Sequence, residues 1–187
     1  MKDESGFVVP PLSRADIRAI AARIREAFKI TEAWFPIVEV LDILLPTLDP
    51  AFYMEIVENE ELGDCHALTI PEEKLIKVRC DVYERAASGH GRDRGTLAHE
   101  FGHLVLHARI GLARRPFHAG IEAFRDSEWQ AKAFAGELLV CPAFVSMGDT
   151  VEVVAERFGV SEDAARIQLK ALRQVGYWLR DQHESIE

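Results

Sequence analysis

Two histidines and a glutamate stand in the order His99-Glu100-Phe101-Gly102-His103, an H-E-x-x-H pattern. Apolar residues around it recur at helical spacing, which predicts a helix over about residues 96–107. Residues four apart on a helix differ by about 40° in azimuth and about 6 Å in rise, so His99 and His103 can bind one metal ion. Glu100 projects beside that metal, where a general base for a metal-bound water is needed. The pattern therefore indicates metal-assisted hydrolysis.

A catalytic zinc ion usually has three protein ligands and one position for water, so a third ligand is needed. The metzincin extension does not apply, because its glycine and histidine are replaced by Leu106 and Arg109. The acidic candidates downstream are Glu122, Asp126, Glu128 and Glu137. On the wheel of a helix predicted over 128–140, Glu128 leads the apolar stripe, whereas Glu137 lies about 180° away and is expected to face solvent. Because a carboxylate on an apolar stripe is costly unless it binds a cation, Glu128 is the predicted third ligand.

The elements expected around these residues are helices and a small sheet. Helices are predicted over about 14–29, 37–45, 96–107 and 128–140, with Ser127 capping the last, and two more begin after Thr150 and Ser161. Strands are predicted over 52–57, 66–70 and 75–79, and loops over 86–95 and 108–126. This order predicts an α+β fold, mainly helical, with a small, largely antiparallel sheet. No linker divides the chain, so residues 1–187 are expected to form one domain.

Composition excludes several functional classes. The chain has 187 residues, of which 48% are hydrophobic, and a formal net charge of −9 that disfavours binding to nucleic acid or to anionic lipid. No apolar run is long enough to cross a membrane, and the start of the sequence lacks the pattern of a secretory signal. We therefore expect a cytoplasmic protein without membrane partners. The three cysteines are widely spaced and indicate neither disulfides nor a cysteine zinc site.

The C-terminal part, about 143–187, contains a helix pair of helix-turn-helix type, with Gly159 ending its first helix. Glu162 and Asp163 stand at the start of the second helix, where they would direct negative charge at phosphates. We therefore expect this pair to pack on the catalytic core without direct contact to nucleic acid. A DNA-binding regulator remains a third hypothesis for the chain.

The segment 92–107 resembles the active-site segment of the ImmA/IrrE family of metallopeptidases, and 128–139 is similar to that family's E-x-x-A-N-x-F-A-x-x-L-L helix. The resemblance extends from about residue 13 to residue 175. It implies a zincin-like fold of gluzincin type and a zinc endopeptidase that acts on a protein substrate, often a helix-turn-helix repressor that is co-encoded with it. It implies His99, His103 and Glu128 as ligands of one Zn²⁺ per chain, and Glu100 as base. Gly95 and Lys132 depart from the family pattern, which commonly has a large apolar residue and an asparagine there.

Weaker signals concern the residues around the metal. Tyr83, His90 and His118 are candidates for stabilising an oxyanion, and the sequence does not choose among them. His107 is expected to support the ligands or the helix end rather than to bind the metal. The arginines near the motif are expected to be solvated loop charges: Arg92, Arg94, Arg109, Arg114 and Arg115. An extended substrate is expected to pair with an edge of the sheet, at strand 75–79.

These observations lead to two functional hypotheses of different classes. The first is a zinc-dependent endopeptidase in which Glu100 is the general base. The alternative is a metal-containing regulatory binding module that recruits a partner without cleaving it. Glu100 favours the peptidase, because a binding module has no need of that carboxylate.

Overall fold

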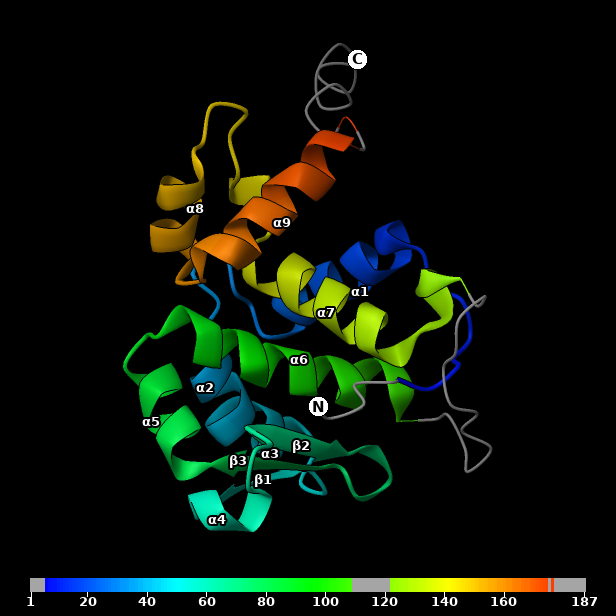
Figure 1. Ribbon diagram of the computed structural model, residues 1–187, viewed down its shortest axis with the longest axis vertical. Coiled ribbons are helices and arrows are strands. Elements are labelled where there is room, and N and C mark those ends of the chain that lie inside the picture. Colours follow the sequence, from blue (N-terminus) through cyan, green and yellow to red (C-terminus); the bar gives the residue numbers. More distant parts are fainter. Residues whose placement is uncertain (1–5, 109–121, 175, 177–187) are drawn as a thin grey trace.

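The computed structural model describes residues 6–108, 122–174 and 176, and its fold is α+β and mainly helical, as predicted (Figure 1). The α-helices are α1 (Arg14–Ala27), α2 (Ile37–Glu39), α3 (Leu45–Leu48), α4 (Asn59–Leu62), α5 (Cys80–Ala87), α6 (Gly91–His107), α7 (Ser127–Leu139), α8 (Val151–Phe158) and α9 (Glu162–Gln174). The strands are β1 (Tyr53–Val57), β2 (Ala67–Ile70) and β3 (Leu75–Arg79). No described helix is both long enough and apolar enough to span a lipid bilayer.

The first two predicted helices form, but the second extends further than expected. Ser13 and Asp16 make the predicted reciprocal capping box at the start of α1. The second helix passes through Pro46 and ends at Leu48, although a proline was expected to end it. A π-helical segment, Val40–Leu44, lies between α2 and α3. Its wider turn gives the proline ring room that a regular α-helical turn would deny it.

The sheet is mixed, with strand order β1-β3-β2. The strands β2 and β3 form an antiparallel hairpin, and Lys74 in the turn between them adopts a left-handed conformation with φ of 51°. β1, however, pairs in parallel with β3, so the sheet is not largely antiparallel. β3 is the central strand and has no free edge, and the expectation that a substrate pairs with 75–79 is wrong. Among the described strands, β2 forms the edge that lies next to α6.

The predicted loop over 86–95 is also wrong, because α5 extends to Ala87 and α6 already begins at Gly91. Gly91 lies against the backbone of Val160, where a Cβ atom would be 2.4 Å from its carbonyl carbon. Arg94 was expected to be a solvated loop charge, but it is buried and its guanidinium lies 3.6 Å from the centre of the Trp34 ring. Its nitrogens donate hydrogen bonds to Phe35 O and Gly159 O. Close packing, not a loop, accounts for this glycine and arginine.

The helices and the sheet form layers around α6 (Figure 1). The sheet covers one side of α6 and α7 covers the other, and α7 is itself covered by α1 and α9. The C-terminal pair α8 and α9 contributes Val154, Phe158, Ala165 and Leu169 to the same hydrophobic core as α6 and α7. Thr150 caps α8, and Gly159 ends it with φ of 59°, as predicted.

The position of Glu137 corrects the sequence analysis. The side chain was expected to face solvent, but it is fully buried between α7 and α1. Arg14 Nε and Arg18 Nε each donate a 2.7 Å hydrogen bond to its carboxylate. Because α7 is covered on both sides, the face opposite its apolar stripe is buried too, and two cations compensate the carboxylate there.

Candidate metal centre

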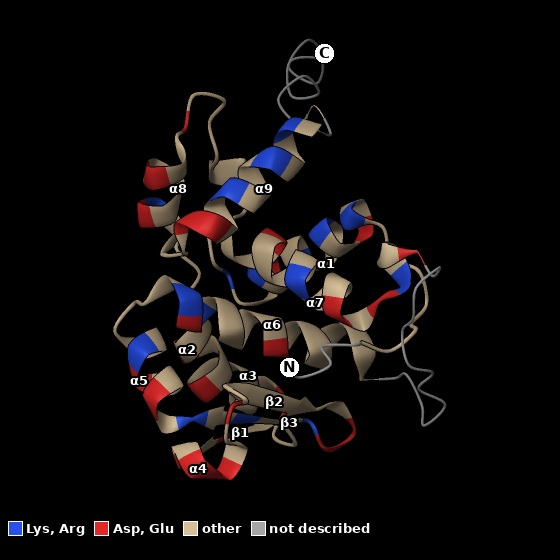
Figure 2. Ribbon diagram, in the orientation of Figure 1, with Lys and Arg blue, Asp and Glu red and all other residues tan. Residues whose placement is uncertain are grey.

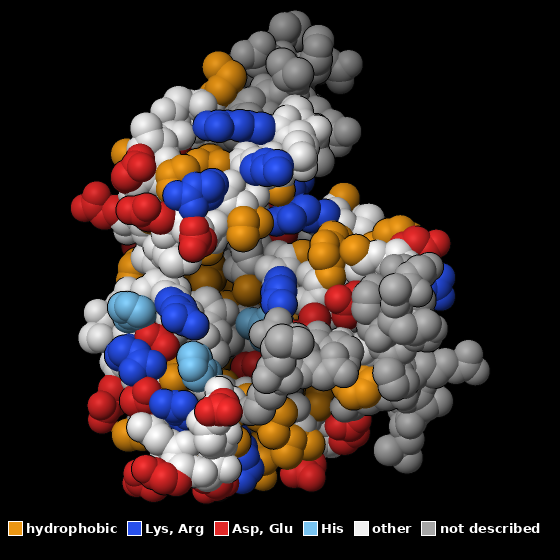
Figure 3. Space-filling model, in the orientation of Figure 1, with side chains coloured by type: hydrophobic (Ala, Val, Ile, Leu, Met, Phe, Trp, Pro, Cys, Tyr) orange, Lys and Arg blue, Asp and Glu red, His pale blue; other side chains and the backbone are white. Residues whose placement is uncertain are grey.

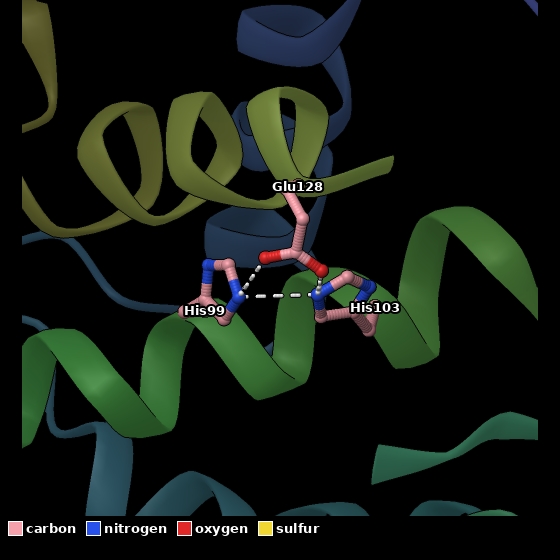
Figure 4. Close-up of side chains that lie close together, drawn as sticks. All are labelled: His99, His103 and Glu128. Carbon is pink, nitrogen blue, oxygen red and sulfur yellow. Dashed lines mark hydrogen bonds and ion pairs between the residues drawn. The ribbon is translucent and has the colours of Figure 1, made fainter. Parts of the chain in front are cut away.

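The active-site helix α6 presents both histidines of the motif on one face (Figure 4). They are four positions apart, and their rings meet edge to face with centroids 4.7 Å apart. The Nε2 atoms of His99 and His103 are 3.1 Å apart. The i and i+4 spacing has therefore aimed two imidazole nitrogens at one point.

A close crossing of two helices brings the third side chain to this point. Gly102 of α6 lies against Ala131 of α7, and a Cβ atom on Gly102 would be 3.2 Å from the Ala131 Cα. Two small residues thus let the helix axes approach one turn away from Glu128. Asp126, not Ser127 as predicted, is the N-cap of α7, and its carboxylate accepts from the Glu128 backbone N–H. The Ser127 hydroxyl instead accepts a hydrogen bond from Phe7 N.

The ligand atoms of the three side chains lie close together, and each Glu128 oxygen faces a different histidine. Glu128 Oε2 lies 3.2 Å from His99 Nε2, and its Oε1 lies 3.2 Å from His103 Nε2. Zinc bonds of about 2.0–2.1 Å in tetrahedral geometry place ligand atoms about 3.3 Å apart. The donor set of two imidazoles and a carboxylate thus fits zinc in both type and spacing. Within the described residues this is the one group of histidine, cysteine and acidic side chains with such spacing.

The electrostatics of Glu128 match this arrangement. Its side chain is about a quarter exposed, with a relative accessibility of 26%. Partial burial opposes its ionisation, but the His103 and His99 imidazoles that contact its oxygens outweigh that effect and hold the pKa of Glu128 well below its ordinary range. The residue is therefore a carboxylate at neutral pH, which is the form that binds a cation.

A chain of hydrogen bonds behind the ligands fixes the tautomer of His103. The amino group of Gln130 donates to Pro10 O and Phe124 O, both at 2.8 Å, so its Oε1 is the acceptor that faces His107 Nε2 at 3.2 Å. His107 Nε2 must then carry the hydrogen, which makes its Nδ1 the acceptor in the neutral ring. His103 Nδ1, 3.1 Å away, is the donor to that atom. The lone pair of His103 is left on Nε2, where a metal would bind.

Glu100, the predicted base, follows His99 in the sequence and is not among the clustered ligand residues. The residue is 9% exposed. Thr69 on β2 has its hydroxyl 2.7 Å from Glu100 Oε2 and 2.9 Å from the Glu100 carbonyl oxygen. The edge strand therefore holds the carboxylate that was predicted to act as a base.

The predicted oxyanion candidates that the structure describes, Tyr83 and His90, make their hydrogen bonds to residues other than the clustered ligands. The Tyr83 hydroxyl pairs with Asp42, and His90 Nδ1 pairs with Asp93 at the start of α6. His118, like three of the five loop arginines, lies outside the described residues. Sequence reasoning missed Thr69 and Gln130. Thr69 is 31 positions from Glu100 and carries no local signal, whereas Gln130 is only two positions after the predicted ligand on the same helix.

Comparison with known proteins agrees with this geometry. Residues 81–170 match the model of a peptidase family described as Peptidase_M78, the IrrE N-terminal-like domain. The matched span includes the three clustered side chains and Glu100. No curated protein matches the chain.

Proposed function

The chain belongs to the ImmA/IrrE family of metallopeptidases through residues 81–170, and from this premise we propose that it is a zinc-dependent endopeptidase that cleaves a protein substrate. A helix-turn-helix repressor encoded beside it is the proposed partner. The observation that carries the proposal is the cluster of His99, His103 and Glu128, whose nitrogens are 3.1 Å apart and each lie 3.2 Å from a different Glu128 oxygen, with Glu100 outside the cluster.

The proposed ligands are His99, His103 and Glu128, and the proposed base is Glu100. A zinc ion bound by such a set supplies an activated water and polarises the scissile carbonyl. Glu100 would accept the proton of the attacking water on its carboxylate and return it to the leaving amine nitrogen. The Thr69 hydroxyl would keep that carboxylate in place, and the Gln130–His107 pair would keep the ligand tautomer of His103.

The substrate is proposed to lie along β2. This strand is an edge of the sheet, and its Thr69 contacts Glu100 directly. An extended peptide that adds to this edge would be held by backbone hydrogen bonds, with its scissile bond beside the proposed base. β3 cannot serve this purpose, because β1 and β2 pair with both of its edges.

Replacing Glu100 by Gln tests the base. The amide keeps the size of the side chain and can still interact with Thr69, but it cannot accept the proton, so hydrolysis should fall by about 10²–10⁴. Purified wild-type protein and Glu100→Gln should both contain about one zinc per chain by elemental analysis, whereas His99→Ala and His103→Ala should not. Glu73→Gln, an exposed change on the β2–β3 turn, is the matched control and should cleave like the wild type.

The assay follows the purified adjacent repressor by gel electrophoresis and mass spectrometry. Equal cleavage rates for the wild type and Glu100→Gln would contradict the mechanism. If both proteins bound the repressor at full zinc loading and neither cut it, the binding-module hypothesis would replace the peptidase.

A further inference from the structure

A groove of about 400 Å³ lies between α6, α7 and the start of α9, and His99 is one of the residues that line it. Figure 3 shows this face of the molecule, with a hollow below the basic side chains of α9. Apolar side chains from α7 and α9 line much of the groove, among them Trp129, Leu139 and Ile167. The groove therefore offers apolar surface next to the proposed metal ligands. We refer to it as the interhelix groove.

The charge of the interhelix groove is opposite to that of the whole chain. The chain has a net charge of −9, yet none of the described residues that line the groove is acidic. Arg92 and Lys132 line it and are exposed. Arg14 also lines it, and it shares the Glu137 carboxylate with Arg18. Figure 2 shows further Lys and Arg residues along the exposed side of α9.

Two details describe the walls of the groove. Gly95 lines it, and no atom lies within 4 Å of the position that a Cβ would take there. Gln168 in the wall accepts from Arg14 through Oε1, and since arginine only donates, the amide orientation is fixed. Its Nε2 is the one buried side-chain nitrogen or oxygen of the described residues with no hydrogen-bond partner.

We propose that the interhelix groove binds a segment of the protein substrate that combines apolar side chains with an aspartate or glutamate, close to the scissile bond. The inference rests on the proposed function, because the groove meets the metal centre at His99. Burial of apolar side chains would supply affinity, and Lys132 and Arg92 would select carboxylates over amines. A segment with lysine in place of the acidic residue would be rejected by like charges.

The test measures binding without hydrolysis. The full-length Glu100→Gln protein, loaded with zinc, is titrated into a fluorescein-labelled dodecapeptide of alternating Leu and Glu, and anisotropy gives Kd. Two further peptides carry Gln or Lys at every Glu position. We expect the Gln peptide to bind about tenfold more weakly and the Lys peptide more weakly still. Equal affinities for the three peptides would overturn the proposal.

Paired variants then locate the binding site. Lys132→Glu should weaken binding of the acidic peptide about tenfold. Lys170→Glu makes the same charge change at an exposed position of α9 that does not line the groove, and it should change Kd less than threefold. Equal losses in the two variants would show a long-range charge effect and refute the site.

A third variant fills the groove without adding charge. Gly95→Leu places a side chain in the open space on α6, where leucine is also the better helix former, so Tm should not fall. Binding of the acidic peptide should weaken about tenfold. Unchanged binding by Gly95→Leu would overturn the proposal, and so would tighter binding of a labelled single-stranded oligonucleotide than of the peptide.

The two proposals fail separately in this design. If the acidic peptide bound with the expected dependence on Lys132 and Gly95 while wild-type protein cleaved nothing, the proposed groove would be supported and the proposed peptidase activity would be refuted. If the repressor were cleaved and Lys132→Glu left both peptide binding and cleavage unchanged, only the proposed role of the groove would be refuted.

Discussion

Replacing Glu137 tests whether a residue of α7 can be important for stability without being needed for metal binding. The carboxylate lies on α7, nine residues after Glu128, and its side chain is fully buried between Arg14 and Arg18. Replacing it by Gln keeps its volume but removes the charge that both arginines share. We expect Glu137→Gln to destabilise the fold without affecting the metal centre.

The magnitude follows from the geometry. Removing one member of a fully buried ion pair costs about 3–5 kcal/mol, because the remaining charge stays unpaired. Here Arg14 and Arg18 are 24% and 22% exposed, so solvent and the Gln168 oxygen that accepts from Arg14 recover part of this cost. We therefore expect a loss of about 2–3 kcal/mol in the free energy of unfolding. For a chain of this length that loss lowers Tm by roughly 4–12 °C.

Urea unfolding followed by circular dichroism at pH 7 measures this change. EDTA is present for every variant, so that bound metal does not add to stability. Glu128→Gln is the matched control, because it makes the same chemical change on the same helix. It should lose zinc by elemental analysis and unfold within about 1 kcal/mol of the wild type in EDTA. Glu137→Gln should show the opposite result, with lower stability and about one zinc per chain.

Two outcomes would refute this reasoning. A stability change below about 0.5 kcal/mol in Glu137→Gln would mean that the buried ion pairs contribute nothing beyond a neutral amide. Zinc loss equal to that of Glu128→Gln would mean that the register of α7 at the metal centre is wrong.

Three further changes test parts of the site and its support. Gln130→Met should weaken zinc binding about 10–100-fold in a competition titration, because the tautomer of His103 would no longer be fixed, while Gln130→Glu, which keeps the acceptor, should retain more affinity. Thr69→Val should lower kcat about tenfold with KM unchanged, and Thr69→Ser should restore it; a loss in both variants would indicate damage to the strand. Burial of Asp93 opposes its ionisation, but hydrogen bonds from Arg85 and His90 prevail and lower its pKa. Its contribution to stability is therefore present above the unfolded value of about 3.9 and lost as pH falls through the lower folded pKa, so Asp93→Asn should cost about 1–2 kcal/mol at pH 7 and little at pH 2 in urea titrations.

The side chains of the candidate metal centre could be predicted from the sequence because helical spacing decides which face of each helix carries them. His99 and His103 share a face whatever the rest of the chain does, and the apolar stripe of α7 pointed Glu128 toward α6. The ends of the active-site helix were less predictable. Gly91 was interpreted as part of a loop, whereas its missing side chain serves the close approach of the Val160 backbone.

Residues whose roles depend on a third element could not be predicted in this way. The helical wheel of α7 shows a single apolar stripe. Nothing in the periodicity of its sequence indicated that α1 and α9 cover the opposite face, where Glu137 is buried. The parallel pairing of β1 with β3 is equally non-local, because the strand between them in sequence, β2, takes the outer position. Both errors concern surfaces that are buried by partners distant in the chain.

The close crossing of α6 and α7 explains why the three clustered side chains could be predicted although Glu137 and β1 were not. A side chain at Gly102 would have to displace the Phe134 ring, 3.0 Å from its Cβ position, and the Ala131 backbone. The distance of α7 from α6 is therefore set by two small residues within one turn of the ligands, and the 3.2 Å separations of Glu128 from both histidines follow from it. The sheet contributes a different part, since Thr69 on β2 reaches Glu100 from the other side of α6. The proposed ligands thus depend on one helix pair and the proposed base on the edge strand, so changes at Thr69 of β2 should alter catalysis before they alter metal binding.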